Sequence, residues 1–410
     1  MSDTTSTPEA LPVLATLACP CCSAVVPDAR FCGACGAHLV YDGFRASQRF
    51  HSYAAFPHEP VFRLSVVTSL FPSLSHRAKA PFRAGFALFL ALLLAFALAG
   101  TSGPLIAVSA LGVPLLFLLY IWEVDPYEGS FLLPTFVCLL IGAGLGTGWA
   151  IIGGSYVDKA LLPSLTSSLT SGTAIAAAIA VPAIGQLLVC VPLVVARFMQ
   201  RGPIESLDGF VAGASGALGF TLAATVDLMA PWLSNGQLTH QSVLANATQV
   251  ILRGISLPLI TAMATGFIGA AYWAKIGASS TSAKGEWIAS PAVALVVALL
   301  IQIGLGFADI AALSDTALIV IHLGAIALLL LATRVGIHHV LLHEALDVTV
   351  GAPRVCAHCT HLVPTMAFCP QCGVAERAIS RPHRPSAVLS AGASPPTPPG
   401  AAGELSGGLA

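Results

Sequence analysis

Eight of the eleven cysteines form two patterns of identical spacing, one near each end of the 410-residue chain. Each pattern is a pair of CxxC motifs separated by nine residues, in CPCCSAVVPDARFCGACG and in CAHCTHLVPTMAFCPQCG. Paired CxxC motifs present four thiolates to a tetrahedral zinc ion, and a glycine after the last cysteine suits a tight turn beside the metal. The spacing therefore predicts two zinc ribbons with the ligands Cys19, Cys22, Cys32, Cys35, Cys356, Cys359, Cys369 and Cys372.

Zinc binding is one of two chemistries that this spacing allows, because four thiols in an oxidising compartment would form disulfides instead. A four-cysteine zinc site leaves no open position for water, so the two ions would be structural rather than catalytic. Modules of this size fold only with metal bound, and they usually hold a protein partner or each other. His358 and His361 are expected bystanders, although either is able to replace a ligand, and Cys21 is a spare thiol.

The composition predicts a chain that crosses a membrane several times. Hydrophobic residues make up 56% of the chain and charged residues only 9%, whereas a soluble domain averages about 25% charged residues. The formal net charge of −1 gives no indication of nucleic-acid binding. We therefore expect membrane lipids and an unidentified protein bound by the ribbons as partners. The first ten residues contain neither the basic start nor the apolar run of a secretory signal.

The hydrophobic runs predict eight transmembrane helices, each close to the roughly 20 residues that a helix needs to cross a bilayer. They lie at residues 84–100, 104–122, 131–152, 173–195, 209–229, 255–274, 287–307 and 316–332. An even number of spans places both ends of the chain on one side. The predicted fold is thus an all-α polytopic membrane bundle with one small zinc-ribbon module at each end.

Basic residues predict the side on which the two ends lie. Most of the lysines and arginines near the spans fall in the loops on the same side as the termini, and only Lys159 and Arg253 fall in the others. The loops on the terminal side contain Arg77, Lys79, Arg83, Arg197, Arg201, Lys275, Lys284 and Arg334. The positive-inside rule therefore predicts a protein of the cytoplasmic membrane with both termini in the cytoplasm. A reducing cytoplasm also favours zinc ribbons over disulfides.

Shifts in composition divide the chain into segments. We expect a flexible N-terminus, a ribbon, an aromatic and basic segment against the lipid headgroups, the membrane core, a juxtamembrane helix, a second ribbon and a disordered tail rich in Pro, Ala and Gly. In order, these segments are residues 1–18, 19–40, 41–81, 82–333, 334–353, 354–377 and 378–410. His339 and His343 share one face of the juxtamembrane helix at a spacing that is able to bind metal, but a solvated helix is the simpler interpretation.

Two stretches of the membrane core resemble motifs of the PrsW family of intramembrane proteases. The stretch WEVDPYEGSFLLPTFVCLLIGAG (122–144) is similar to an acidic, aromatic loop that opens a glycine-rich helix in that family. The stretch LDGFVAGASGALGF (207–220) is similar to a second motif, in which an Asp-Gly begins a span. The residues in register with it are Asp208, Gly209, Gly213, Leu218, Gly219 and Phe220. The resemblance covers about residues 120–269 and implies a helical bundle built around a protease site.

The chain departs from this pattern where the resemblance implies reactive side chains. The family is expected to carry a glutamate pair with a lysine in a proline-bounded helix, then a Glu-Asn pair, then an arginine followed by a histidine. Arg253 fits the arginine. The other positions are occupied by Gly185, Gln186, Val189, Ala224, Thr225 and Ile260. The expected carboxylates and histidine are therefore missing, while the prolines around Gln186 would still break the helix.

Peptide hydrolysis in a membrane needs an activated water and a group that stabilises the oxyanion. The candidates that remain for an active site are Gln186, Asp208, Asp227 and His322. Asp227 lies about one helical turn beyond Ala224, so it would partly replace the lost glutamate. The simpler interpretation makes His322 a neutral histidine bonded to a neighbouring helix and puts Asp227 and Asp309 at the outer boundary. Gln186 would keep an interhelical hydrogen bond worth roughly 1 kcal/mol, but an amide is no general base.

Three functions are compatible with these residues. The first is a PrsW-like pseudoenzyme that recruits cytosolic partners through its ribbons, and the sequence favours it. The second is an active intramembrane metalloprotease with a rearranged site that uses Asp227 and His322. The third is a small-solute transporter or channel, for which we find neither an inverted repeat nor a charged pathway at the midplane.

Overall fold

The computed structural model describes residues 15–20, 22–39, 80–124, 132–161, 172–199, 205–234, 247–277, 290–311, 313–346, 351–356 and 358–375. Within these ranges, eight helical stretches are long and apolar enough to cross a membrane, which confirms the predicted number. Most of the predicted segments 1–18, 41–81 and 378–410 lie outside the described residues, as does Cys21.

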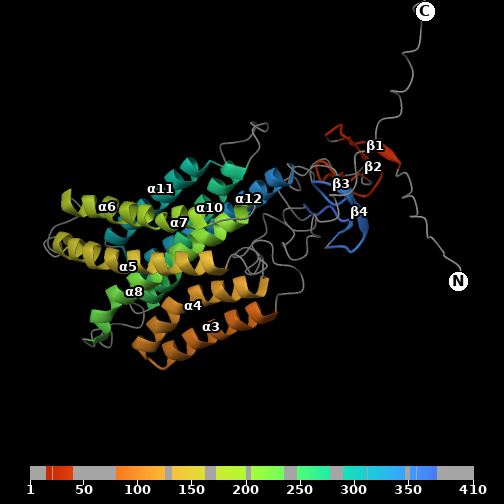
Figure 1. Cartoon of the computed structure of the whole chain (residues 1–410). Helices are drawn as coiled ribbons and strands as arrows, with labels where there is room; N and C mark the ends of the chain where they lie inside the picture. Colours follow the sequence, from red (N-terminus) through yellow and green to blue (C-terminus); the bar gives the residue numbers. More distant parts are fainter. Residues whose placement is uncertain are drawn as a thin grey trace, which may run out of the picture.

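The helices run roughly along one direction and form an elongated bundle (Figure 1). Their bounds are α3 (Ala80–Leu98), α4 (Ser102–Val124), α5 (Leu132–Leu161), α6 (Gly172–Leu188), α7 (Val191–Met199), α8 (Ser206–Ser234), the π-helix η3 (Val250–Ser256), α10 (Leu257–Gly277), α11 (Pro291–Ile310) and α12 (Asp315–Leu346). One of the eight spans is interrupted, because α6 and α7 share it, and in another the π-helix η3 continues directly into α10.

Helix α8 is the centre of the bundle and packs most extensively against α5 and α10. Glycines allow this close approach. A Cβ atom at Gly219 would collide with the carbonyl oxygen of Leu139 on α5, and one at Gly213 would collide with the carbonyl oxygen of Thr265 on α10. Small residues at such crossings let helix backbones pack closely in a membrane, where lipid supplies no hydrophobic drive for helix association. Gly213 and Gly219 therefore serve close helix packing in the structure.

The span that contains Gln186 is broken, as its prolines predict. Helix α6 ends at Leu188 and α7 begins at Val191, because Pro192 has no N–H to donate to the carbonyl of Leu188. Pro182 lies inside α6 without ending it. The break therefore lies one turn beyond Gln186, and the side chain of Gln186 projects from the last regular turn before it.

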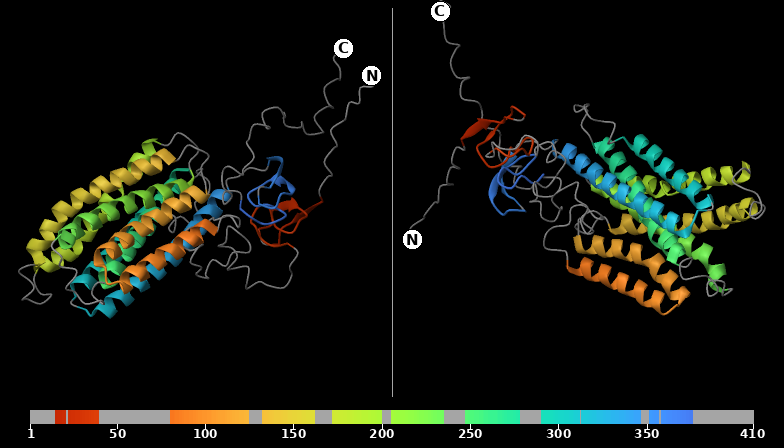
Figure 2. Two further views of the ribbon diagram at one scale, coloured as in Figure 1. Left: turned by 90° about the horizontal axis from the view of Figure 1, so that it is seen from below. Right: turned by 180° about the vertical axis from the view of Figure 1, so that it is seen from behind.

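The two ribbons are small two-stranded antiparallel modules beyond one end of the bundle, close to the end of α12 (Figures 1 and 2). The N-terminal ribbon, residues 15–39, contains β1 (Thr16–Ala18) and β2 (Val25–Pro27). The C-terminal ribbon, residues 351–375, contains β3 (Gly351–Val355) and β4 (Leu362–Thr365). We call this end of the bundle the ribbon end.

The juxtamembrane helix is partly buried in the structure, whereas a solvated helix is expected from the sequence. Helix α12 continues without a break from the last span to Leu346. On this extension Arg334, Ile337, His338 and Leu341 are buried, because it packs against other helices and the C-terminal ribbon. The side chain of His343 lies outside the described residues, so the His339–His343 pair stays untested.

Candidate functional site

Each ribbon gathers its four cysteine sulfurs at a separation that suits one metal ion. Within each set the Sγ atoms all lie within 4.8 Å of one another. A tetrahedral zinc ion with Zn–S bonds of about 2.3 Å sets its sulfurs about 3.8 Å apart. The observed Sγ–Sγ distances are 3.8 Å for Cys19–Cys35, 3.8 Å for Cys22–Cys32, 3.9 Å for Cys356–Cys372 and 3.8 Å for Cys359–Cys369. The described cysteines form no disulfide, so the donor set fits a four-thiolate metal site.

The knuckle turns place these sulfurs in the same way in both ribbons. Gly36 and Gly373 have φ values of 74° and 71°, the left-handed conformation that glycine adopts at no steric cost. Ser23 and Thr360 occupy the equivalent left-handed position of the first knuckle in each ribbon, with φ values of 61° and 60°. Burial raises the pKa of the Cys35 thiol, so a metal that binds there displaces a proton.

The two histidines of the C-terminal ribbon are outside its metal site. His361 donates from Nδ1 to the carbonyl oxygen of Cys359 at 2.8 Å, and its side chain is exposed. His358 is exposed as well. The group that is able to hold a metal contains the four cysteines alone, which agrees with the expected bystander role.

In the membrane core, the positions where PrsW-like reactive groups are expected are filled by helix packing. Gln186 is 2% exposed, and its Nε2 donates to Thr265 Oγ1 on α10 at 3.3 Å. Its Oε1 is buried with no hydrogen-bond partner among the described residues. Val189 and Ile260 are 0% and 1% exposed. Ala224 is also buried, so an amide and apolar groups replace the expected carboxylates and histidine.

Three buried polar contacts join α10 and the adjoining η3 to three other helices. Gln186 on α6 bonds Thr265, as described above. Gln302 on α11 donates from Nε2 to Thr261 Oγ1 at 3.2 Å. His322 on α12 contacts Ser256 at the end of η3. Such interhelical hydrogen bonds stabilise a membrane bundle and specify which faces meet.

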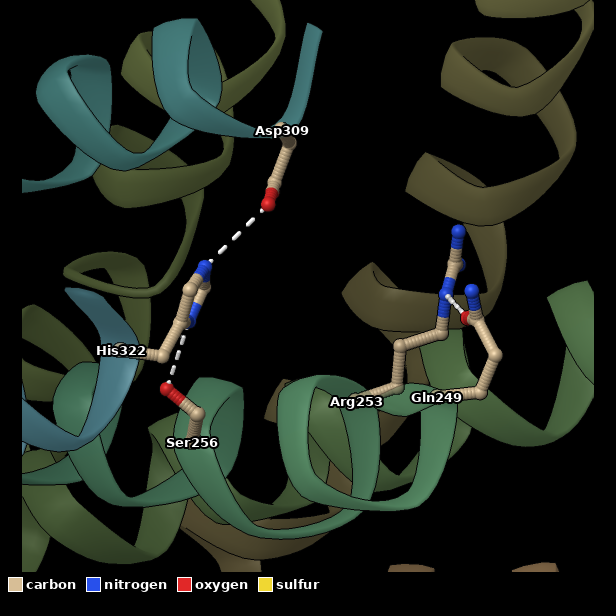
Figure 3. Close-up of polar contacts among 5 residues, drawn as sticks. All are labelled: Gln249, Arg253, Ser256, Asp309 and His322. Atoms are coloured by element: carbon tan, nitrogen blue, oxygen red, sulfur yellow. Dashed lines mark hydrogen bonds and ion pairs between the residues drawn. The ribbon is translucent and has the colours of Figure 1, made fainter. Parts of the chain in front are cut away.

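His322 lies between two oxygen atoms (Figure 3). Its Nδ1 is 2.8 Å from Ser256 Oγ and its Nε2 is 3.2 Å from Asp309 Oδ1. A neutral imidazole satisfies both contacts if Nε2–H donates to the carboxylate and Nδ1 accepts from the serine hydroxyl. The prediction that His322 is bonded to a neighbouring helix is therefore confirmed. The Asp309 side chain is 49% exposed, so this chain of contacts connects a buried serine to the surface.

Arg253 lies on the π-helix η3, which also carries Ser256. Its Nε donates to Gln249 Oε1 at 2.9 Å (Figure 3). A π-helix is rare and frequently occurs at functional sites. The apolar sequence around it contains no signal for the widened turn, and nothing near Ser256 marks it as the partner of His322. Gln302 carries the same signal as Gln186, a lone amide in an apolar run, and sequence reasoning missed it.

The two aspartate candidates do not converge with His322. Asp208 is fully buried in the first turn of α8 at the ribbon end, and Asp227 lies roughly 28 Å further along the same helix. Among the described residues, the groups of three or more His, Cys, Asp or Glu side chains that are able to share a metal ion are the two cysteine sets. The rearranged site that would combine Asp227 with His322 is therefore not assembled by any contact of the described residues.

Comparison with protein families supports the sequence resemblance. A family model described as PrsW family intramembrane metalloprotease matches residues 133–333, from the start of α5 into α12. Neither the curated proteins nor the solved structures include a match to the chain.

Proposed function

With a membrane core that matches the PrsW family, we propose that this protein is an inactive relative of the intramembrane metalloproteases. Its two ribbons would hold zinc and display a binding surface to cytosolic proteins. The observation that carries the proposal is Gln186. It occupies the position of an expected glutamate, is buried, and donates a hydrogen bond to Thr265 on α10.

The amide of Gln186 removes the proton acceptor that a glutamate would supply. A carboxylate at this position would be able to accept a proton from water or to bind a metal, but an amide does neither at neutral pH. The neighbouring Val189 and the Ile260 side chain are apolar and buried, so they offer no second ligand or oxyanion donor. A cavity in the core, lined by Val113, Phe117, Leu218, Met263 and other apolar residues, provides no polar partners to hold a water molecule.

The cysteine sites favour zinc over other metals because four thiolates in tetrahedral geometry select a soft or borderline ion. Each ion would stabilise a ribbon that is too small to fold by itself. Zinc would thus maintain two rigid modules on the cytoplasmic side, where the positive-inside rule places both termini. The exposed faces of these modules are the surfaces on which we expect a protein partner.

The proposal predicts the metal content of the purified full-length chain. We expect zinc at two ions per chain, one for each cysteine set, by inductively coupled plasma mass spectrometry. Replacing Cys32 and Cys369 with serine should remove both ions, while His322→Ala should remove neither. A further ion that survives the cysteine changes and disappears in His322→Ala would overturn the proposal and favour an active, rearranged metalloprotease.

A further inference from the structure

We propose that the two ribbons form a single intramolecular module that is seated on the membrane bundle by the C-terminal ribbon alone. In this arrangement the described residues of the N-terminal ribbon are held against the bundle through the partner ribbon. Metal binding at Cys356, Cys359, Cys369 and Cys372 then controls the position of both ribbons, whereas metal binding in the N-terminal ribbon controls only that ribbon. The inference is independent of whether the membrane core is catalytic.

The ribbons are joined by two equivalent backbone hydrogen bonds. The N–H of Phe31 donates to the carbonyl of Pro370 at 2.9 Å, and the N–H of Phe368 donates to the carbonyl of Gly33 at 2.9 Å. When the cysteine patterns are aligned, Phe31 corresponds to Phe368 and Gly33 corresponds to Pro370. The two bonds are therefore related by an approximate two-fold axis between the ribbons, and each ribbon uses the same edge to bind the other.

Side chains of the C-terminal ribbon complete the contact. Met366 is buried in an apolar cluster with Cys19, Val26 and Cys32 of the N-terminal ribbon. A Cβ atom at Gly33 would collide with Met366, and one at Gly36 would collide with the ring of Phe368. Glycines at these positions therefore make room for the partner ribbon. Three of the four N-terminal cysteines, Cys19, Cys32 and Cys35, belong to this cluster, while Cys22 is exposed, so the pairing covers one side of that metal site.

The C-terminal ribbon also packs on the ribbon end of the bundle. Its residues Ala367, Phe368 and Ala375 form one buried cluster with helix residues. The helix residues of that cluster are Phe210 of α8, Ala270 of α10, and Ile337 and Leu341 of α12. No apolar cluster of the described residues joins the N-terminal ribbon to a helix. Phe368 thus contributes both to the contact between the ribbons and to the contact of the C-terminal ribbon with the bundle.

The sequences of the two ribbons explain why the C-terminal ribbon makes this contact. Where it has Ala367 and Ala375, the N-terminal ribbon has Arg30 and His38 at the equivalent positions. Two small apolar side chains fit an apolar seat of phenylalanine, isoleucine and leucine, whereas an arginine and a histidine would be desolvated there without a partner. Arg30 is exposed in the structure. The asymmetry is a property of these two positions, because the folds of the ribbons are otherwise alike.

The same positions provide the test. Ala367→Arg places in the C-terminal ribbon the residue that the folded N-terminal ribbon already carries, so the ribbon should still fold and bind zinc. Ala375→His is a second variant of the same kind, and Arg30→Ala is the matched control. Full-length protein is reconstituted in nanodiscs, and hydrogen exchange is followed by mass spectrometry in residues 28–36, 366–375 and 334–341. Zinc content confirms that both ribbons remain loaded.

We expect Ala367→Arg to lose slow exchange in 334–341 while the ribbon pair keeps its protection in 28–36. Met366→Ala should instead lose slow exchange in 28–36 while 334–341 stays protected. Cys369→Ser should remove protection from all three segments, whereas the matched Cys32→Ser should leave 334–341 protected. Unchanged exchange in 334–341 for both Ala367→Arg and Ala375→His would show that the C-terminal ribbon does not pack on the bundle through these residues. Equal loss in 334–341 for Cys32→Ser and Cys369→Ser would overturn the order of assembly.

Discussion

His322 illustrates how a single polar residue is accommodated in an apolar bundle. It contacts Ser256 on η3 and Asp309 at the end of α11, so each ring nitrogen has a partner. The two contacts join α12 to two other segments. The residue therefore contributes to helix pairing, and this role needs no charge on the ring because both oxygens are satisfied by the neutral tautomer.

His322→Ala should destabilise the bundle by about 1–3 kcal/mol, because it leaves the buried Ser256 hydroxyl without its partner. Asp309→Asn is the matched control. It should have a much smaller effect, since the Asn carbonyl oxygen still accepts from Nε2–H at a half-exposed site. Thermal unfolding in detergent measures both changes. An equal loss of stability in the two variants would show that the contact depends on charge, contrary to the neutral interpretation.

At the scale of elements, the approach of α5 and α8 depends on glycine. Gly219→Ala should destabilise the protein by about 1–3 kcal/mol, because its Cβ would meet the backbone carbonyl of Leu139 and force the helices apart. Gly144→Ala, on the same α5 helix, is the matched control, since a Cβ there meets no atom within 4 Å. It should be neutral or stabilise by up to about 1 kcal/mol. The same unfolding assay compares them, and equal destabilisation would contradict close packing as the role of Gly219.

The elements that could be predicted from the sequence are those set by local patterns. The spans follow from apolar runs, and the thiol sets follow from spacing within a short segment. The break before Pro192 is equally local. In contrast, the pairing of His322 with Ser256, the π-helix and the burial of Arg334 depend on which helices are neighbours. Spacing along a single helix carries no information about the residues on the helix opposite, so these contacts were outside the reach of sequence reasoning.

At the scale of the whole molecule, the ribbon contact restricts the topology. Two modules at opposite ends of the chain are able to bond each other only if both lie on the same side of the membrane. This agrees with the eight candidate spans found among the described residues, because an even number returns the chain to the same side. The side itself is a prediction from the basic residues, and the ribbon thiols are a suitable reporter of it. The other described cysteines, Cys138 and Cys190, lie inside the bundle.

Ribbon thiols should be accessible only from the cytoplasmic side. Zinc thiolates react slowly, so a chelator is added first to expose the cysteines. A membrane-impermeant maleimide should then leave the protein unlabelled in intact spheroplasts and label it in inside-out vesicles. Because the two ribbons of one chain are joined by the Phe31–Pro370 and Phe368–Gly33 hydrogen bonds, serine variants that retain only one cysteine set should give the same result for either set. Labelling of one set from each side would contradict the pairing, and labelling of both from outside would reverse the orientation.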